Sequence, residues 1–140
     1  MRTQLVDTSK PEVETALRWL QTLIFPADEV LDPTVGWWWV VRDGEVPVAF
    51  AGLRSVPSWK GAVYLARCGV LRAYRGRGIQ KALIDIRQRK AKALGFTDLI
   101  TTTYRNPTSA NNLIRRGFFV YEPHRRWGAE DTIYWKKKIA

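Results

Sequence analysis

The stretch from Gly69 to Gly95, which reads GVLRAYRGRGIQKALIDIRQRKAKALG, restricts the fold more than any other part of this chain. An apolar run ends in the basic turn Arg75–Gly78, and a helical pattern begins directly after the turn. Glycine lets a backbone pass close to a ligand, and the first N–H groups of a helix have no partner inside the helix. The stretch therefore predicts a strand, a turn suited to phosphate and a helix, in that order.

Hydrophobic periodicity organises the rest of the chain. Helical spacing predicts helices at residues 10–25, 76–94 and 109–116, the first of them behind a capping box at Ser9. Strand-prone runs lie at residues 37–42, 46–53, 62–71, 98–104, 118–122 and 132–139. The strand–helix–strand unit around the turn implies parallel pairing with a right-handed crossover. We therefore predict an α+β fold with a mixed sheet, formed as one domain over residues 1–140.

Composition sets the broad class. A chain of 140 residues with 46% hydrophobic residues can bury a core, and the tryptophan triplet 37–39 is expected in that core rather than in a ligand cage. Cys68 is the only cysteine, which excludes an intrachain disulfide and suits a reducing cytoplasm. No apolar run could span a membrane, and the N-terminus lacks a signal-like apolar stretch. We therefore predict a cytoplasmic location and no membrane partner.

The net charge of +10 is unevenly distributed. Residues 72–92 hold eight bases against Asp85 alone, whereas residues 1–33 hold six acids against three bases. This asymmetry indicates an anion bound near the middle of the chain and a cation near its start. The bases expected at the anion are Arg72, Arg75 and Arg77. The bases expected on a solvated helix face are Arg87, Arg89, Lys90 and Lys92.

Two common nucleotide-binding classes are disfavoured. No GK[ST] follows the glycines, so the turn is not a Walker A loop. Gly76-Arg77-Gly78 lacks the third glycine of a dinucleotide-binding turn, and its strand–helix–strand unit lies mid-chain in a small predicted mixed sheet. A different phosphate-containing ligand is needed.

Two segments resemble a known family. Residues 70–80, VLRAYRGRGIQ, are similar to motif A of the GNAT superfamily of acyl-CoA-dependent N-acetyltransferases, V-x-x-x-x-[RQ]-x-x-G-x-[GA]. Residues 106–118, from Asn106 through Leu113 to Gly117-Phe118, resemble the family's motif B. The separation of the two segments and the order of elements also fit. The resemblance covers the whole chain as topology and residues 65–120 as motif.

This resemblance implies a GNAT-like fold with a βαβ core, and helices on both faces of a mostly antiparallel sheet. It implies acetyl-CoA as the co-substrate that acetylates a primary amine by direct attack. The turn would hold the pyrophosphate through its amides and the helix dipole, using Arg75, Gly76, Arg77, Gly78, Ile79, Gln80 and Lys81. The backbone of Cys68, Gly69 and Val70 would pair with the pantetheine arm, and Asn106 and Ser109 would reach the arm from its other side. The Val70 N–H would be the oxyanion donor.

Two positions depart from the family pattern. Gln80 stands where glycine or alanine is usual, so its side chain must point away from the pyrophosphate or donate to it. Leu113 stands where many members carry the tyrosine that protonates the departing thiolate. The source of the proton for the thiolate therefore stays open. It is water or a sheet tyrosine such as Tyr121 or Tyr134, or catalysis relies on substrate positioning without a dedicated acid.

The base is equally open. No carboxylate lies in the run 62–71, where some members keep a glutamate. Glu29 and its neighbours Asp28 and Asp32 lie in the stretch that flanks the acceptor site in the family. They would attract a cationic amine and pass its proton to water, or they are ordinary cap and surface acids.

The remaining reactive side chains carry weaker predictions. Cys68 has no histidine near it in sequence, so a small core residue is favoured over a nucleophile. His124 is a surface residue or a base on the acceptor side. One histidine and one cysteine make no metal site, so no metal is predicted.

Other functions also fit the composition. A sequence pI of 10.2, Lys136–Lys138 and the arginine pairs 115–116 and 125–126 fit a nucleic-acid-binding module, which is not favoured because no known motif of that kind appears. An acyl-CoA sensor without catalysis fits the leucine at position 113. The acceptor amine stays open between a small amine, an amino acid, a protein N-terminus and a lysine, and the protein is predicted to be a monomer or a homodimer.

Overall fold

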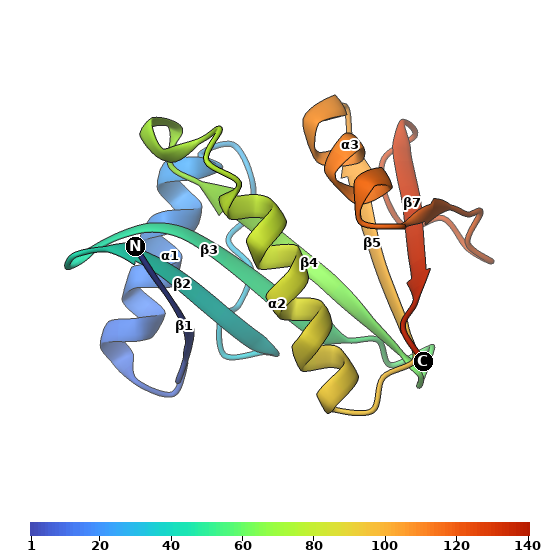
Figure 1. Ribbon diagram of the computed structural model, residues 1–140, viewed down its shortest axis with the longest axis horizontal. Helices are drawn as coiled ribbons and strands as arrows, with labels where there is room; N and C mark the ends of the chain where they lie inside the picture. The colour runs from blue at the N-terminus through green and yellow to red at the C-terminus, as the bar shows by residue number, and fades with distance from the viewer. The chain divides into compact units, whose positions relative to one another are not determined.

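The computed structural model describes residues 1–140 and contains three α-helices and seven strands (Figure 1). The helices are α1 (Pro11–Ile24), α2 (Ile79–Ala93) and α3 (Pro107–Arg115). The strands are β1 (Arg2–Val6), β2 (Trp37–Asp43), β3 (Val46–Ser55), β4 (Ala62–Val70), β5 (Asp98–Tyr104), β6 (Phe119–Val120) and β7 (Thr132–Lys138). The three predicted helices and the six predicted strands are confirmed.

The strands are hydrogen-bonded in the order β1-β2-β3-β4-β5-β7-β6. Strand β4 pairs with β5 in parallel through three residue pairs, from Ala62–Asp98 to Tyr64–Ile100. The pairs β1–β2, β2–β3, β5–β7 and β6–β7 are antiparallel. The predicted mixed, mostly antiparallel sheet with its α+β class is therefore confirmed.

The residues fall into two compact units. The first comprises Met1–Arg54 and Leu65–Arg87, and the second comprises Ser55–Tyr64 and Gln88–Ala140. Strand β4 and helix α2 each contribute residues to both units. The single domain over residues 1–140 stays a prediction.

Strand β1 is the element that sequence periodicity missed. Its five residues, RTQLV, are exposed except for the half-buried Val6. A strand with one inward-facing apolar residue has no period-2 signal. It forms because its backbone pairs with β2, in a register that runs from Arg2–Arg42 to Val6–Trp38.

The predicted capping box at the start of α1 is wrong. Lys10 is the N-cap residue, and no side chain caps this end of the helix. The Ser9 backbone N–H and hydroxyl both donate to Asp7 Oδ1, at 3.0 and 2.6 Å. The serine therefore closes a local turn before the helix, which sequence spacing does not distinguish from a cap.

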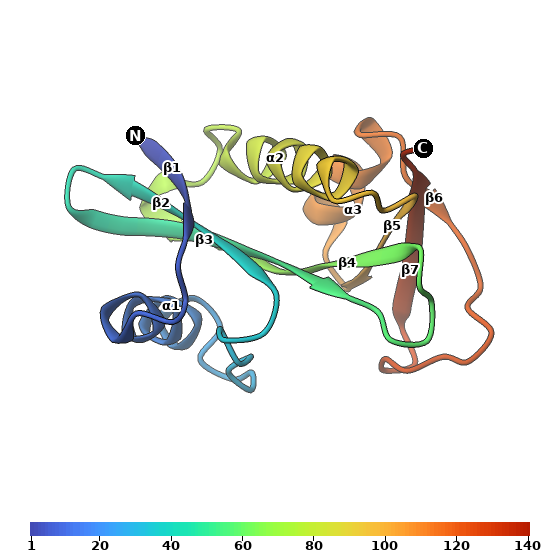
Figure 2. The same cartoon turned by 90° about the horizontal axis from the view of Figure 1, so that it is seen from below.

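The core of the first unit lies between α1 and the face of β2 and β3 that it covers. Leu17 and Leu20 of α1 pack with Trp38, Val40 and Phe50, and each of the five is at most 1% exposed. Helices α1 and α2 lie on opposite faces of these strands (Figure 2). Trp38 therefore serves this core and Trp39 is also buried, as predicted for the triplet, whereas Trp37 is half-buried.

Arg87 contradicts the predicted solvated face of α2. Its side chain is 2% exposed. Its Nε donates to the Leu83 carbonyl oxygen, and its Nη1 donates to the carbonyl oxygens of Gly52 in β3 and Ala66 in β4, each at 3.0 Å. A buried guanidinium is stabilised only where acceptors surround it, because desolvating the charge is costly. Arg87 thereby ties α2 to two strands.

In the second unit, β7 pairs with β5 along seven residues and with β6 along two. Residues in register point to the same face of a sheet. One face carries Lys137, whose ammonium group donates to the Arg116 carbonyl oxygen at the end of α3, at 2.6 Å. Helix α3 therefore covers this face, and the opposite face carries Tyr134 and Lys136.

We predict that Arg87→Ala will lower the free energy of unfolding by about 2–4 kcal/mol, because buried strand carbonyls lose their donor. Arg89→Ala, two residues along the same helix at an exposed position, should change it by less than about 0.5 kcal/mol. Urea unfolding at constant m-value measures both. Equal midpoints for the two variants would contradict the structural role of Arg87.

Candidate functional site

The basic turn is built from backbone. After η1 (Arg72–Tyr74), Arg75 is extended, and Gly76 and Gly78 both have φ of +77°. Such a conformation strains any residue with a Cβ, so glycine at both positions lets the turn form without strain. The first hydrogen bond of α2 runs from the Ala82 N–H to the Gly78 carbonyl oxygen, at 3.1 Å. The N–H groups at the start of α2 therefore have no partner inside the helix.

The arginine side chains of the turn are held by the protein. Arg75 Nε donates to the Val70 carbonyl oxygen at 3.1 Å, and Arg77 Nη2 donates to the Ala73 carbonyl oxygen at 3.3 Å. The Arg77 guanidinium also lies 4.8 Å from the centre of the Tyr74 ring. No carboxylate pairs with either arginine, so their positive charge stays beside the helix N-terminus, where both favour an anion.

Tyr74 fixes the base of the turn. Its hydroxyl donates to Asp43 Oδ2 at 2.7 Å, and this hydrogen bond raises the pKa of Tyr74. The tyrosine therefore stays a neutral phenol at physiological pH, and it links the turn to the end of β2.

Strand β4 leads into the turn with two small residues. Gly69 is buried, and a Cβ at this position would lie 2.8 Å from ring carbons of both Phe25 and Phe50. Glycine is thus required by packing against α1 and β3. Burial raises the pKa of the Cys68 thiol, with the charge of Arg87 opposing the rise. A neutral thiol fits a packing residue rather than a nucleophile.

Sequence reasoning missed Arg67, the residue that joins β4 to the loop after α1. Its Nη1 donates to Gln21 Oε1 at 3.1 Å and to the Glu29 carbonyl oxygen at 2.7 Å, and its guanidinium lies 5.1 Å from the centre of the Phe25 ring. The sequence does hold a signal for it, which is an arginine inside an otherwise apolar strand. A charged side chain in such a place needs polar partners.

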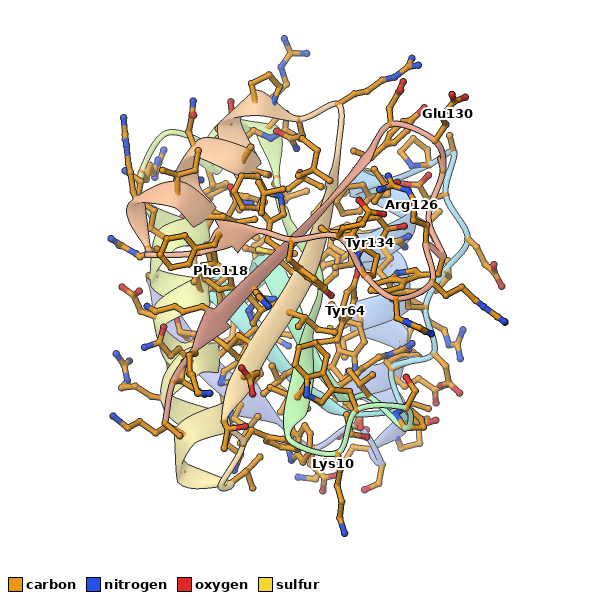
Figure 3. All side chains as sticks on the ribbon, turned by 90° about the vertical axis from the view of Figure 1, so that its right-hand side faces the viewer. Lys10, Tyr64, Phe118, Arg126, Glu130 and Tyr134 are labelled. Carbon is orange, nitrogen blue, oxygen red and sulfur yellow. The ribbon has the colours of Figure 1, made fainter.

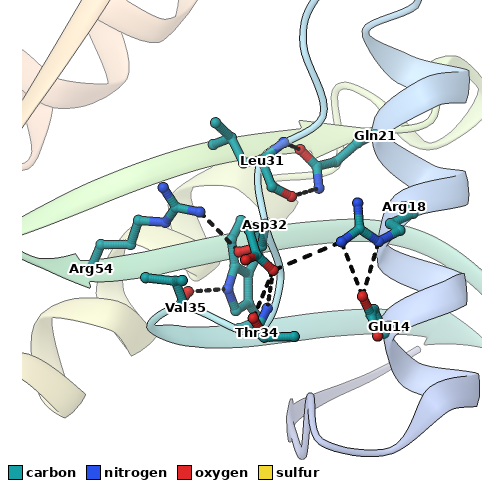
Figure 4. Close-up of polar contacts among 9 residues, drawn as sticks. Glu14, Arg18, Gln21, Leu31, Asp32, Thr34, Val35 and Arg54 are labelled. Carbon is teal, nitrogen blue, oxygen red and sulfur yellow. Dashed lines mark hydrogen bonds and ion pairs between the residues drawn. The ribbon is translucent and has the colours of Figure 1, made fainter.

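The loop after α1 is also pinned by Gln21, which is 1% exposed. Its amide donates to the Leu31 carbonyl oxygen and accepts from the Leu31 N–H, at 3.0 and 2.9 Å (Figure 4). This pair of bonds holds the segment with the predicted acids against α1.

The three predicted acids differ in what they bind. Asp32 Oδ1 accepts from the Thr34 hydroxyl at 2.7 Å and from its N–H at 2.9 Å, and Arg18 lies 3.8 Å away (Figure 4). These bonds lower the pKa of Asp32, so it is a weaker base than an ordinary aspartate. The exposed side chains of Asp28 and Glu29 take part in no such turn.

In the second unit, Tyr134 is fully buried and holds a loop. Its hydroxyl oxygen accepts from the backbone N–H groups of Trp127 and Gly128, at 3.0 and 2.8 Å. The Arg126 guanidinium lies 4.8 Å from the centre of the Tyr134 ring, and Figure 3 shows the two side chains together near Tyr64. This is the environment of a residue that anchors the β6–β7 loop, and its role as proton donor stays a prediction.

The motif B residues of the second unit form and cap helix α3. Asn106 is the N-cap, and its Oδ1 accepts from the Ser109 N–H at 3.0 Å. Leu113 is 5% exposed and packs in the interior. Their roles beside a cofactor stay predictions, and the helix cap alone explains the asparagine.

His124 is exposed, in the loop between β6 and β7. No cluster of three or more histidine, cysteine or carboxylate groups is arranged to hold a metal ion. None of the three helices has the length and apolar character needed to cross a bilayer.

Comparison with known proteins identifies the class. The model of the acetyltransferase (GNAT) family matches residues 3–118. This chain therefore belongs to the GNAT family and is an N-acetyltransferase by class, as the two motifs predicted. A search of curated proteins returned no match.

Solved structures share the fold at low sequence identity. An acetyltransferase from Bacillus subtilis in complex with CoA has a TM-score of 0.73 and 17% identity, with 99% of each chain covered. The ribosomal-protein-S18-alanine N-acetyltransferase from Escherichia coli has a TM-score of 0.77 and 16% identity, with 99% of this chain and 95% of that chain covered. The acetyltransferase yncA from Salmonella typhimurium, with its cofactor acetyl-CoA, has a TM-score of 0.72 and 16% identity, with 99% and 93% covered.

The raised pKa of Cys68 predicts slow alkylation by iodoacetamide at neutral pH, because the thiolate is the reacting form. The rate should rise with pH and reach half of its maximum above the ordinary thiol value of 9.0. Cys68→Ala should retain acetyl transfer. A midpoint below pH 8, or loss of transfer in the folded alanine variant, would point to an activated nucleophile instead.

We also predict that Tyr134→Phe will lower the free energy of unfolding by about 1–3 kcal/mol, because two backbone N–H groups lose their acceptor. Tyr104→Phe is the matched control, since Tyr104 is 50% exposed. Thermal unfolding measures both variants. A Tyr134→Phe variant as stable as the control would show that the loop does not depend on this hydroxyl.

Proposed function

We propose that this protein transfers an acetyl group from acetyl-CoA to a primary amine, with the pyrophosphate of the cofactor held at residues 75–81. The observation that carries the proposal is the pair of left-handed glycines, Gly76 and Gly78, which open α2 beside two arginines without carboxylate partners. Backbone N–H groups, helix dipole and guanidinium charge coincide there. Each of these three contributions favours a bound diphosphate.

The turn accommodates a ligand close to its backbone. A Cβ built on Gly76 or Gly78 would meet no heavy atom within 4 Å, so the space beside both residues is open. Lys81 lies one residue before the first amide that is bonded within the helix, and its ammonium would add to the charge. The CoA and acetyl-CoA in the titles of the Bacillus and Salmonella structures support the choice of ligand.

The backbone of strand β4 is the proposed binding site of the pantetheine arm. Its register with β5 ends at Tyr64, and the residues proposed to bind the arm, Cys68, Gly69 and Val70, lie beyond that point. Amides of the pantetheine would pair with this backbone as an added strand does. The Val70 N–H would then stabilise the negative charge that develops on the thioester oxygen.

The reaction is a direct displacement. The amine nitrogen attacks the thioester carbonyl carbon, the new C–N bond forms, and the C–S bond breaks. The amine loses one proton to water near Glu29, whose carboxylate is exposed. The thiolate takes up a proton, and we propose Tyr134 or water as its source, because Leu113 has no acidic group.

An alternative within the same fold is an acyl-CoA sensor that binds the thioester without turnover. Leu113 at the position of the usual tyrosine is the observation that favours it. Release of free thiol from acetyl-CoA, screened against chemically diverse amines, separates the two. Amine-dependent release shows an enzyme, and binding without release shows a sensor.

Acetyl-CoA at a hundredfold excess over its Kd should add about 2.7 kcal/mol of stability, which raises Tm by several degrees. Arg75→Ala should weaken binding by about tenfold or more, because a charged phosphate contact is lost. Arg89→Ala removes the same charge from an exposed position farther along α2 and is the control. Calorimetric titration measures all three proteins. Absence of binding in the parent protein would refute the proposed function, and equal affinity in the two variants would refute the site.

A further inference from the structure

The second unit carries most of the net charge. Residues 55–64 and 88–140 hold twelve lysines and arginines against four acids, which gives +8 of the total +10. The basic turn proposed for acetyl-CoA lies in the first unit, so it accounts for none of this excess. The charge of the second unit therefore calls for a separate explanation.

Part of this charge lies next to exposed aromatic rings on one face of the second unit. Phe119 of β6 is in register with Lys136 of β7, so the two side chains share a face. Phe119 is 72% exposed, and Lys136 is exposed. The Lys136 ammonium lies 5.2 Å from the centre of the Tyr121 ring, and the Tyr121 and Trp59 ring centres are 6.4 Å apart. We call Phe119, Lys136, Tyr121 and Trp59 the aromatic strip.

Lysines extend the strip at one end. Lys138 follows Lys136 on the same face and is exposed. It is in register with Asp98, which in turn is in register with Ala62 of β4. Exposed Lys60 precedes this strand by two residues, directly after Trp59. Three lysines and three aromatic residues therefore lie along the strip and its margin.

The acids of the unit leave this surface positive. Two of the four pair with arginines, Asp131 with Arg105 and Glu122 with Arg126, while Asp98, which is in register with Lys138, accepts from the Thr97 hydroxyl. No carboxylate forms an ion pair with Lys136 or Lys138. The exposed Phe119 ring therefore lies beside cations that have no carboxylate partner, a combination that suits an anionic ligand with flat apolar parts.

We propose that the aromatic strip binds single-stranded nucleic acid. Bases would stack on Phe119 and on the exposed parts of Tyr121 and Trp59, while Lys136, Lys138 and Lys60 would neutralise backbone phosphates. Stacking platforms interleaved with cations are how proteins hold single strands without reading sequence. A duplex keeps its bases inside, so it would engage the lysines alone. The function is additional to acetyl transfer and does not depend on it.

The test is fluorescence anisotropy of labelled oligo-U and oligo-dT 20-mers, with a duplex of equal length for comparison, in the presence of saturating CoA. Phe119→Ala should weaken binding to single strands at least fivefold, because one stacked base is lost. Val120→Ala is the matched control, since Val120 is 63% exposed on the opposite face of the same strand. Phe119→Leu keeps the apolar bulk without the ring and should also weaken binding.

The salt dependence of nucleic-acid binding distinguishes a local role of the strip's lysines from an effect of net charge. Lys136→Gln should reduce the slope of log affinity against log salt by about 0.7 for a single strand. Arg115→Gln removes the same charge at an exposed position in α3, on the opposite face, and should leave the slope unchanged. Unchanged Tm values would show that each variant is folded.

Three results would overturn the proposal. Tighter binding of duplex than of single strands would remove the stacking argument. Equal losses of affinity in Lys136→Gln and Arg115→Gln would show that binding depends on net charge alone. Binding of polyglutamate as tight as that of oligo-U, unaffected by Phe119→Ala, would assign the surface to an acidic protein partner. Acetyl transfer, measured by thiol release, should be unchanged by Phe119→Ala, so failure here is distinct from failure of the proposed function.

Discussion

The buried guanidinium of Arg87 is the interaction on which the first unit depends. One side chain donates to a carbonyl oxygen of its own helix and to carbonyl oxygens of β3 and β4. It therefore fixes α2 on the strands, and the start of α2 is where the basic turn presents its amides. A charge that is hydrogen-bonded in this way is costly to disturb, because the same low dielectric that strengthens its bonds penalises any loss of them.

Glycines and buried polar side chains have different structural roles around the turn. Gly69 allows the rings of Phe25 and Phe50 to pack against β4, while Gly76 and Gly78 allow the reversal that opens the helix. Gln21 and Arg67 hold the acid-bearing loop against α1 and β4. Backbone positions the proposed donor site, and side-chain hydrogen bonds position the loop that carries Glu29.

The two units differ in how their acidic and basic residues are balanced. In the first unit, nearly balanced acids and bases leave the arginines of the turn as a local positive site. In the second unit, bases are in excess, and Lys136 of β7 lies beside the aromatic rings of Phe119 and Tyr121. The proposed nucleic-acid surface therefore uses different cationic residues from the turn proposed for acetyl-CoA.

The sequence by itself determined the elements and the turn, because strand and helix periods, glycines and capping asparagine act over a few residues. It predicted the mixed sheet and the helix after Asn106, although not that this asparagine is the N-cap. It did not predict β1, whose signal is backbone pairing, or the burial of Arg87 and the role of Arg67. The acceptors of those arginines include carbonyl oxygens 21, 35 and 38 residues away in the chain. Only the tertiary structure brings such groups together, so only it decided which charges are buried and which remain for a ligand.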